Sequence, residues 1–453
     1  MNDLRGESPP LAPARAAEAR PSLDWRQAQL APGEPIRNAI PVIDSEHQVA
    51  LVVDSDARLL GKVTDSDLRR AMLEGVSQEA PVSSIMRSHG DAPWVRRLGQ
   101  SRPQNATYDA EGRRAAERQD SDPDSKPNAE RYPLRRHPIV DAEGRVVGMA
   151  NADAPNPLED RWMVIMAGGL GRRLRPLTEE IPKPMLPLGG RPMLERLVLT
   201  LKEQGFRRFY LSVHYLAEVI EDHFGDGSRF GVQVEYVREP EPRGTAGALA
   251  LLPQRPQESF FVMNADVLTQ VSFRHLFELH EEHSAEATLC VLEHGIPVPF
   301  GVVDLEGHGI TAIREKPTAR FFVSGGIYLL EPSALDLIPQ DQPFDMPSLL
   351  DDLIQKERTT AAFPVREYWL DVGRPSDFHR AQGDWRRIFA KKGKTAADEG
   401  ASFSSEQLVS SLETNTPETA RSEHSSPPQG AVSPRPSIKP ASDDLPASER
   451  EAS

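Results

Sequence analysis

Two apolar periods alternate through the first half of residues 161–390, and shorter strand-like runs dominate after residue 287. Short apolar runs of strand length are separated by segments in which apolar residues return every three or four positions. The first pattern indicates a buried strand and the second a helix with one buried face. This alternation predicts an α/β fold, a doubly wound and mostly parallel sheet with ligands at the carboxyl ends of its strands. The predicted strands are 162–166, 208–213, 232–237 and 260–263, and the predicted helices 192–204, 216–224, 245–252 and 272–283.

A smaller α+β module is predicted at residues 24–155. Its first half has helix-like spacing at 36–43, apolar strands at 49–53 and 59–63, and a helix from Thr64 to about residue 75. The turn and second strand recur, since Val53-Asp54…Arg58-Leu59-Leu60-Gly61 matches Val140-Asp141…Arg145-Val146-Val147-Gly148. We therefore expect two related units, the second degenerate and separated from the first by a polar insertion at about 99–131.

The remaining segments and the overall composition limit the classes of function. Residues 1–23 and 395–453 have no apolar period, so we predict disorder there. A net charge of −15 over 453 residues argues against a nucleic-acid binder or a membrane-surface protein. No apolar run is long enough to span a bilayer, and no secretory signal is evident. The single cysteine, Cys290, lies in an apolar run and is predicted to be a core residue, in a cytoplasmic soluble protein.

A glycine-rich, basic stretch follows the predicted strand 162–166. Backbone N–H groups at Gly168, Gly169 and Gly171 can approach an anion closely, and Arg172, Arg173 and Lys183 can neutralise it. This chemistry suits a polyphosphate; the alternative is a tight turn with a solvated basic face. The spacing matches neither the dinucleotide fingerprint nor the P-loop.

The whole string from Gly168 to Thr178, followed by Lys183-Pro184, resembles the signature of the sugar-1-phosphate nucleotidylyltransferases. The resemblance implies that the loop wraps a nucleoside triphosphate and that Arg173 and Lys183 stabilise phosphoryl charge. Arg172 stands where the family usually has Thr or Ser, which removes a hydroxyl contact and adds a cation.

Two aspartates match the metal-binding aspartates of this family. Asp266 follows the predicted strand 260–263, and Asp371 lies in Trp369-Leu370-Asp371-Val372-Gly373. By this resemblance they hold Mg²⁺, which lets two anionic substrates meet. Taken alone, Asp266 is equally consistent with a residue that caps a turn.

The segment Gly244-Thr245-Ala246-Gly247-Ala248-Leu249 resembles the family's segment that contacts the nucleobase and ribose, in the form found in guanylyltransferases. It favours GTP over dTTP, UTP or CTP, with Glu239 or Glu241 as an acceptor for the guanine edge. The alternative is a glycine-containing helix start with Thr245 near its cap.

Three further motifs match those that contact the sugar phosphate. They contain Gly301 in Phe300-Gly301-Val302-Val303, then Glu315 and Lys316 before Pro317. Ser324 replaces the usual asparagine, which leaves the identity of the sugar open. Short strands predicted at 287–292, 301–304, 310–314 and 326–330 would form this sugar-binding half.

The N-terminal repeat resembles a pair of CBS motifs. Thr64 and Asp67 match the residues that often hold an adenosine ribose, which would make an adenine nucleotide a partner. A structural use, or use in a homo-oligomer, is the alternative.

Together these resemblances imply an enzyme that transfers a nucleotidyl group from an NTP to a sugar 1-phosphate, for surface glycan or glycoprotein sugar biosynthesis. The substitutions at Arg172 and Ser324 motivate a second hypothesis, a nucleotide-binding regulatory subunit without turnover. His275, His280 and His283 share one predicted helix, and their spacing permits a metal site. Because no H-E-x-x-H motif is present, they are interpreted as a solvated face.

Overall fold

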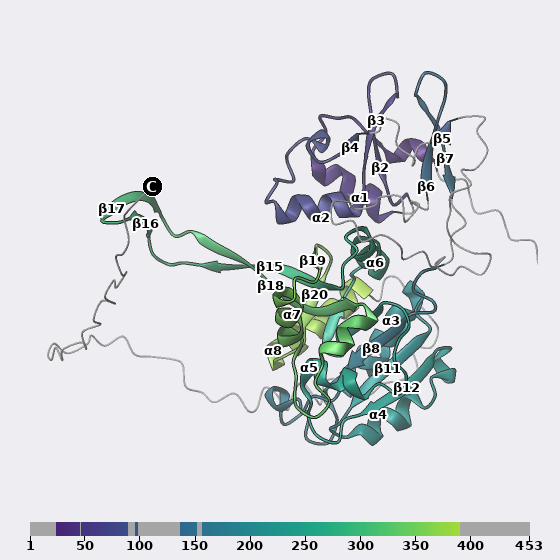
Figure 1. Ribbon diagram of the computed structural model, residues 1–453, viewed down its shortest axis with the longest axis vertical. Coiled ribbons are helices and arrows are strands. Elements are labelled where there is room, and N and C mark those ends of the chain that lie inside the picture. The colour runs from purple at the N-terminus through teal and green to yellow at the C-terminus, as the bar shows by residue number, and fades with distance from the viewer. Residues whose placement is uncertain (1–23, 46, 89–95, 98–135, 152–155, 390–453) are drawn as a thin grey trace, which may run out of the picture. The chain divides into compact units, whose positions relative to one another are not determined.

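The computed structural model describes residues 24–45, 47–88, 96–97, 136–151 and 156–389 (Figure 1). The segments predicted to be disordered and the predicted polar insertion lie outside the described residues.

A seven-stranded sheet forms the centre of the main domain. Its strand order is β12-β11-β8-β13-β18-β15-β19, and four of the six neighbouring pairs are parallel. The predicted α/β class and mostly parallel sheet are therefore confirmed. The strands are β8 (Trp162–Met166), β11 (Arg208–Val213), β12 (Gln233–Arg238), β13 (Phe260–Asn264), β15 (Ala287–Pro297), β18 (Thr318–Leu330) and β19 (Thr360–Pro364).

Helices cover both faces of this sheet because its strands are apolar on both sides. Along β8, Met163 and Ile165 pack into one core, whereas Trp162 and Val164 pack into the other. The first core includes α3 (Met193–Gln204), α4 (Ala217–Phe224) and α6 (Phe273–Glu282), and the second includes α5 (Gly244–Gly247) and α7 (Met346–Gln355). Cys290 is fully buried in the first core, as predicted.

Several predicted elements differ in length from those observed. The predicted helix 245–252 is a single α-turn, α5, followed by a 3₁₀ turn at Ala248–Leu251. Two predicted strands, 287–292 and 326–330, are the inner ends of β15 and β18, which run on into a long hairpin. The remaining elements are β9 (Pro187–Leu188), β10 (Arg191–Pro192), β14 (Val267–Thr269), β16 (Val302–Glu306), β17 (Gly309–Arg314), β20 (Trp369–Asp371) and α8 (Pro375–Asp384).

The interpretation of the α6 histidines as a solvated face is wrong for two of the three. His275 and His280 are buried, with exposed fractions of 8% and 1%, and the His280 ring lies 2.8 Å from the Thr288 hydroxyl. Only His283 is exposed. The described residues contain no group of three or more side chains placed to hold a metal.

In the N-terminal module the two predicted turns have the same hydrogen bonds. Asp54 Oδ1 accepts from the N–H groups of Asp56 and Arg58, and Asp141 Oδ1 accepts from the N–H groups of Glu143 and Arg145. The two repeats also pair with each other, since Leu59 N–H donates to the Gly144 carbonyl at 3.0 Å. The elements are β1 (Gln29–Leu30), α1 (Ala39–Asp44), β2 (Ala50–Val53), β3 (Leu59–Val63), α2 (Asp65–Leu73), β4 (Arg87–Ser88), β5 (Arg96–Arg97), β6 (Arg136–Val140) and β7 (Val146–Asn151).

A buried ionic cluster joins α2 to the segment after β19, within one compact unit of the chain. The Arg69 side chain is fully buried, and it donates to Asp65 at 2.5 Å, to Glu367 at 2.6 Å and to the Pro364 carbonyl. Arg366 also donates to Asp65, at 2.9 Å. Burial alone would raise the pKa of Asp65, but the charges of Arg69, His275 and Arg366 outweigh it and hold that pKa well below its usual value.

None of the helices in the described part of the chain has both the length and the apolar character needed to cross a membrane.

Replacing Arg69 by methionine should strongly destabilise the protein. The change keeps a long side chain but leaves Asp65 and Glu367 without their shared partner, and breaking a buried ion pair costs about 3–5 kcal/mol. Denaturant unfolding would measure the loss. The matched control is Arg255→Met, which removes the exposed pair with Asp336 and should cost less than about 1 kcal/mol. Equal effects of the two substitutions would contradict the role given to the cluster.

Candidate active site

The glycine-rich loop after β8 is closely packed at two of its glycines. Gly171 has φ +60°, and a Cβ there would lie 3.0 Å from the Thr178 side chain and 3.1 Å from that of Lys183. A Cβ on Gly168 would lie 2.8 Å from Glu239 Oε1. Since a side chain at Gly171 would need both a rare backbone conformation and more room, glycine keeps the loop close to Lys183.

Main-chain pairing places Asp266 and Asp371 next to each other. Asp266 lies between β13 and β14, and Asp371 ends β20, which pairs with β14 in the register Val267↔Asp371. The Val372 N–H donates to the Asp266 carbonyl at 2.9 Å. Each residue could be identified from its own sequence motif. Their proximity could not, because it depends on pairing between segments about a hundred residues apart.

Two of the predicted cations lie at this acidic pair. Lys183 Nζ donates to Asp266 Oδ2. A Cβ on Gly373 would lie 3.3 Å from Asp371 Oδ2 and 3.5 Å from Arg173 Nη1, which places the guanidinium beside that carboxylate. The structure therefore brings together four of the predicted residues, here called the charge cluster: Arg173, Lys183, Asp266 and Asp371.

The electrostatics of Asp371 favour an added positive charge. Its Oδ1 is buried and makes no hydrogen bond. Burial and then the negative charge of Asp266 raise the pKa of Asp371, against the opposing effect of Lys183 and Arg173. Two carboxylates with a free buried oxygen fit a hard divalent cation such as Mg²⁺, which commonly takes one or two protein carboxylates and fills its other positions with phosphate and water.

The residues predicted to contact sugar phosphate divide into two groups. Ser324 lies where β18 enters the sheet, and the next residue, Gly325, accepts a hydrogen bond from Trp369 Nε1 at 2.9 Å. A Cβ on Gly326 would lie 2.7 Å from Asn264, two residues before Asp266. Ser324 is therefore close to the segments that carry the charge cluster. Gly301, Glu315 and Lys316 instead lie around β16 and β17, which stand away from the sheet (Figure 1).

The residues predicted to bind the nucleobase have partners within the protein. Gly244 has φ +79°, and Thr245 N–H donates to Asp345 Oδ1 at 2.9 Å. Ala246 is buried, and its N–H donates to the Phe344 carbonyl. Asp345 was not identified from the sequence, because it lies a hundred residues from the turn it holds.

The suggestion that the Glu239 carboxylate accepts hydrogen bonds from guanine conflicts with the contacts that this carboxylate makes within the protein. One carboxylate oxygen accepts from the Ser212 hydroxyl at 2.5 Å, and the other accepts from the Arg243 N–H at 3.0 Å. The residue is 9% exposed. Glu239 therefore positions the loop that begins at Arg243, while Glu241 remains exposed.

In the N-terminal module the structure uses Asp67 as a helix cap. Asp67 is fully buried; one oxygen accepts from the Thr64 N–H and hydroxyl, and the other accepts from Arg70 and Arg87. A ribose would have to displace these donors. Adenine-nucleotide binding by Thr64 and Asp67 stays a prediction, and the observed contacts favour the structural alternative.

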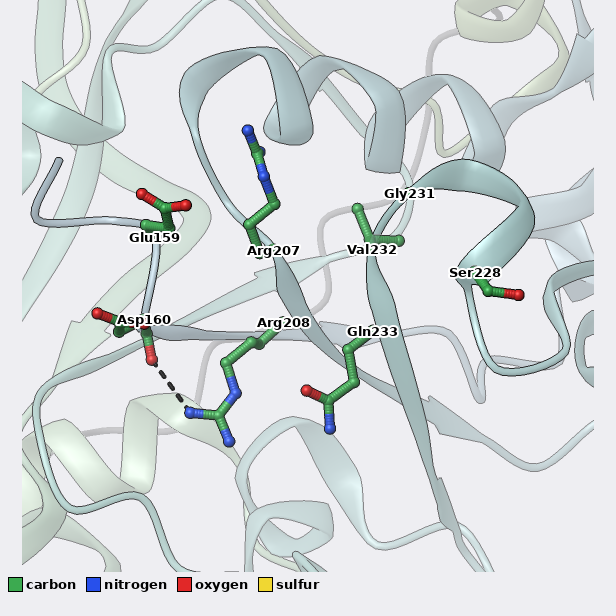
Figure 2. A pocket seen from close by; sticks show the side chains of 8 residues that line it. All are labelled: Glu159, Asp160, Arg207, Arg208, Ser228, Gly231, Val232 and Gln233. Atoms are coloured by element: carbon green, nitrogen blue, oxygen red, sulfur yellow. Dashed lines mark hydrogen bonds between the residues drawn. The ribbon is translucent and has the colours of Figure 1, made fainter. Parts of the chain in front are cut away.

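An open hollow of about 510 Å³ lies elsewhere in the main domain (Figure 2). Its lining includes Asp160 before β8, Arg208 at the start of β11 and Gln233 at the start of β12. These are the amino ends of parallel strands, whereas the charge cluster lies beyond their carboxyl ends. Because ligands of such sheets bind at the carboxyl ends, the hollow is not the candidate active site.

By fold and site, the main domain is an α/β domain with a cluster of two cations and two carboxylates beyond the carboxyl ends of its parallel strands. The family model for nucleotidyl transferases matches residues 162–387, and that for CBS domains matches residues 28–74. A mannose-1-phosphate guanylyltransferase of Mycobacterium tuberculosis is 34% identical over 264 residues, which cover 54% of this chain and 72% of that protein. The chain belongs to the nucleotidyl transferase family.

Two further relatives match over similar lengths. The probable mannose-1-phosphate guanylyltransferase 1 of Oryza sativa subsp. japonica is 35% identical over 224 residues, covering 48% of this chain and 62% of that protein. The solved structure of HddC from Yersinia pseudotuberculosis is 28% identical and aligns over 50% of this chain and 99% of its own, with a TM-score of 0.40. The chain thus spans less than two thirds of the length of several curated relatives.

Replacing Asp371 by asparagine should stabilise the metal-free protein at neutral pH. Because the pKa of Asp371 is raised in the folded chain, folding loses stability as the pH rises through the interval between the unfolded and folded pKa values. Asparagine does not ionise, so the variant avoids this loss. Thermal unfolding in a chelator at several pH values would measure the difference in stability between the wild type and the variant. The exposed Asp351→Asn is the control.

Adding MgCl₂ to the same samples supplies a second measurement. Ligand that binds only the folded state raises the unfolding midpoint, so the midpoint should rise for the wild type and not for Asp371→Asn. A variant less stable than the wild type at neutral pH would contradict the assigned repulsion.

Proposed function

We propose that this protein transfers a nucleotidyl group from a nucleoside triphosphate to a sugar 1-phosphate, releasing pyrophosphate. The observation that carries the proposal is the charge cluster, which sets two cations against two carboxylates at the carboxyl edge of the sheet. Membership of the nucleotidyl transferase family and the guanylyltransferase relatives support it. The product would be a nucleoside diphosphate sugar for glycan or glycoprotein synthesis.

The reaction requires two anions to meet. A phosphate oxygen of the sugar 1-phosphate attacks the α-phosphorus, and the bond to the bridging oxygen of the leaving pyrophosphate breaks as its electron pair passes to that oxygen. We assign Arg173 and Lys183 to neutralise the developing charge, and the N–H groups of Gly168, Gly169 and Gly171 to position the triphosphate, with Arg172 adjacent. No protein nucleophile is needed.

A divalent metal, taken as Mg²⁺, is part of the proposal. Asp266 and Asp371 would hold it, and it would neutralise phosphate charge when bound. The free Oδ1 of Asp371 supports this assignment. Lys183, which donates to Asp266, would be shared between that carboxylate and the substrate phosphates.

We propose GTP as the favoured nucleotide and leave the sugar open. Support comes from the segment Gly244-Thr245-Ala246 and from relatives named as mannose-1-phosphate guanylyltransferases. In the arrangement described, the N–H groups of Thr245 and Ala246 donate to Asp345 and Phe344, so GTP would be read by other groups or after a local rearrangement. We place the reaction in the cytoplasm as part of the proposal, because its highly charged substrates do not cross a bilayer unaided.

Pyrophosphate release over a matrix of substrates tests the proposed function. GTP, dTTP, UTP, CTP and ATP would each be combined with hexose and hexosamine 1-phosphates, mannose 1-phosphate included. We expect GTP to give the highest kcat/KM. A different preferred base would overturn the base assignment alone. Nucleotide binding without turnover in any combination would favour the regulatory subunit instead.

Replacing Asp266 by asparagine should lower kcat by on the order of a hundredfold or more, because a charge that balances Lys183 and holds the metal is lost. Single-turnover pyrophosphate release would measure the effect, and circular dichroism would confirm the fold. Asp351→Asn, an exposed change on α7, is the matched control and should retain full activity. Near-normal turnover by Asp266→Asn would refute the role of the acidic pair.

A further inference from the structure

The outer halves of β15 and β18 form a two-stranded arm that leaves the sheet (Figure 1). β15 pairs with β19 as far as Val291, and from Leu292 to Pro297 its described pairing is with β18 alone. β16 and β17 form the tip and pair only with each other among the described strands. We define the arm as residues 292–323. A two-stranded ribbon of this kind has little stability of its own in water.

Uncovered apolar side chains are concentrated on this arm. Of the fourteen large apolar side chains that are exposed in the described part of the chain, nine lie between Ile296 and Val323. At the tip, the cross-strand pairs Val303↔Ile313 and Leu305↔Ile310 share one face, and their side chains are 44–65% exposed. On the opposite face Arg314 donates to Asp304 at 2.9 Å. The tip is therefore amphipathic, and such an exposed apolar face marks a docking surface.

The arm also carries residues that the proposed reaction requires. Glu315 and Lys316 lie just after β17, with side chains 75% and 69% exposed, and Gly301 lies just before β16. Lys316 has φ +44°, a conformation that non-glycine residues seldom adopt and that surrounding contacts usually impose. Strands β16 and β17, which these residues flank, stand apart from β20, which ends at Asp371 (Figure 1).

We propose that two copies of this chain exchange arms, so that the arm of one copy completes the active site of the other. The inference rests on the proposed function. A second copy is the occupant that the residues favour, because each copy has a charge cluster that lacks these sugar-phosphate residues and an arm that carries them. Exchange of identical elements is reciprocal under twofold symmetry, which closes the assembly as a dimer. The body offers an apolar contact beside the cluster, since Ile181, two residues before Lys183, is 38% exposed.

Complementation between two inactive variants tests the exchange. Asp266→Asn disables the body of one copy and Lys316→Ala the arm of the other, and each homodimer should lose on the order of a hundredfold in kcat/KM. In a heterodimer with exchanged arms, one site combines the intact body with the intact arm. Heterodimers co-expressed with two affinity tags and purified on both should therefore regain about half of the wild-type activity.

The control pairs Asp266→Asn with Asp371→Asn. Both changes lie on the body, so neither site of that heterodimer is intact, and it should stay inactive. Full activity of the Lys316→Ala homodimer, or an inactive Asp266→Asn/Lys316→Ala heterodimer alongside an active wild type, would overturn the exchange. A wild type without turnover on the whole substrate matrix would instead refute the proposed function.

Light scattering after size exclusion gives a test that does not depend on turnover. The wild type should be a dimer, and Leu305→Ser combined with Ile310→Ser should make it monomeric, because both changes remove apolar area from the tip. Val219→Ser, an exposed apolar residue on α4, is the matched control and should remain dimeric. A monomeric wild type, or a double variant that stays dimeric, would overturn the proposal.

Discussion

Two carboxylates that repel each other must be held side by side, and much of the main domain serves to do this. Asp266 and Asp371 come together because β14 pairs with β20, not because their side chains attract. Burial and mutual repulsion raise the pKa of Asp371. Lys183 offsets part of this cost at Asp266. A cation bound between the two carboxylates would relieve the repulsion that remains. A pair of charges that is unfavourable on its own can in this way form a binding site.

The elements that sequence could predict are those whose pattern is local. The bounds of β8, β11 and β3 agree with the predicted strands, because an apolar run is a property of its own residues. The charge cluster was also predictable residue by residue, through motifs that resemble one family. The helix predicted at 245–252 is an α-turn followed by a 3₁₀ turn, and the N–H groups at its start bind Phe344 and Asp345, contacts that local periodicity does not contain.

What sequence could not supply were the contacts between distant segments. His275 and His280 were interpreted as part of a solvated face because no metal-binding motif includes them, yet tertiary packing buries both. Glu239 was considered for the nucleobase, and only the fold shows that Ser212 and the Arg243 N–H occupy it. The arm was hidden for the same reason. Strands β16 and β17 lie close to the strands predicted at 301–304 and 310–314, but the periodicity of these runs does not say how far β15 and β18 extend beyond the sheet.

The N-terminal module contributes to the scaffold on which Asp371 is placed. Arg69 binds the Pro364 carbonyl and Glu367, at the start of the segment that leads into β20. The main domain also holds this segment, because the Tyr368 carbonyl accepts hydrogen bonds from the Gln270 N–H and the Thr269 hydroxyl. Asp371 follows three residues later. A buried ion pair adds little net stability. It does restrict the geometry strongly, because each buried charge must lie against its partner. The ionic cluster therefore suits a module whose use is to fix the course of this segment, and that is the structural alternative also favoured by the buried cap at Asp67.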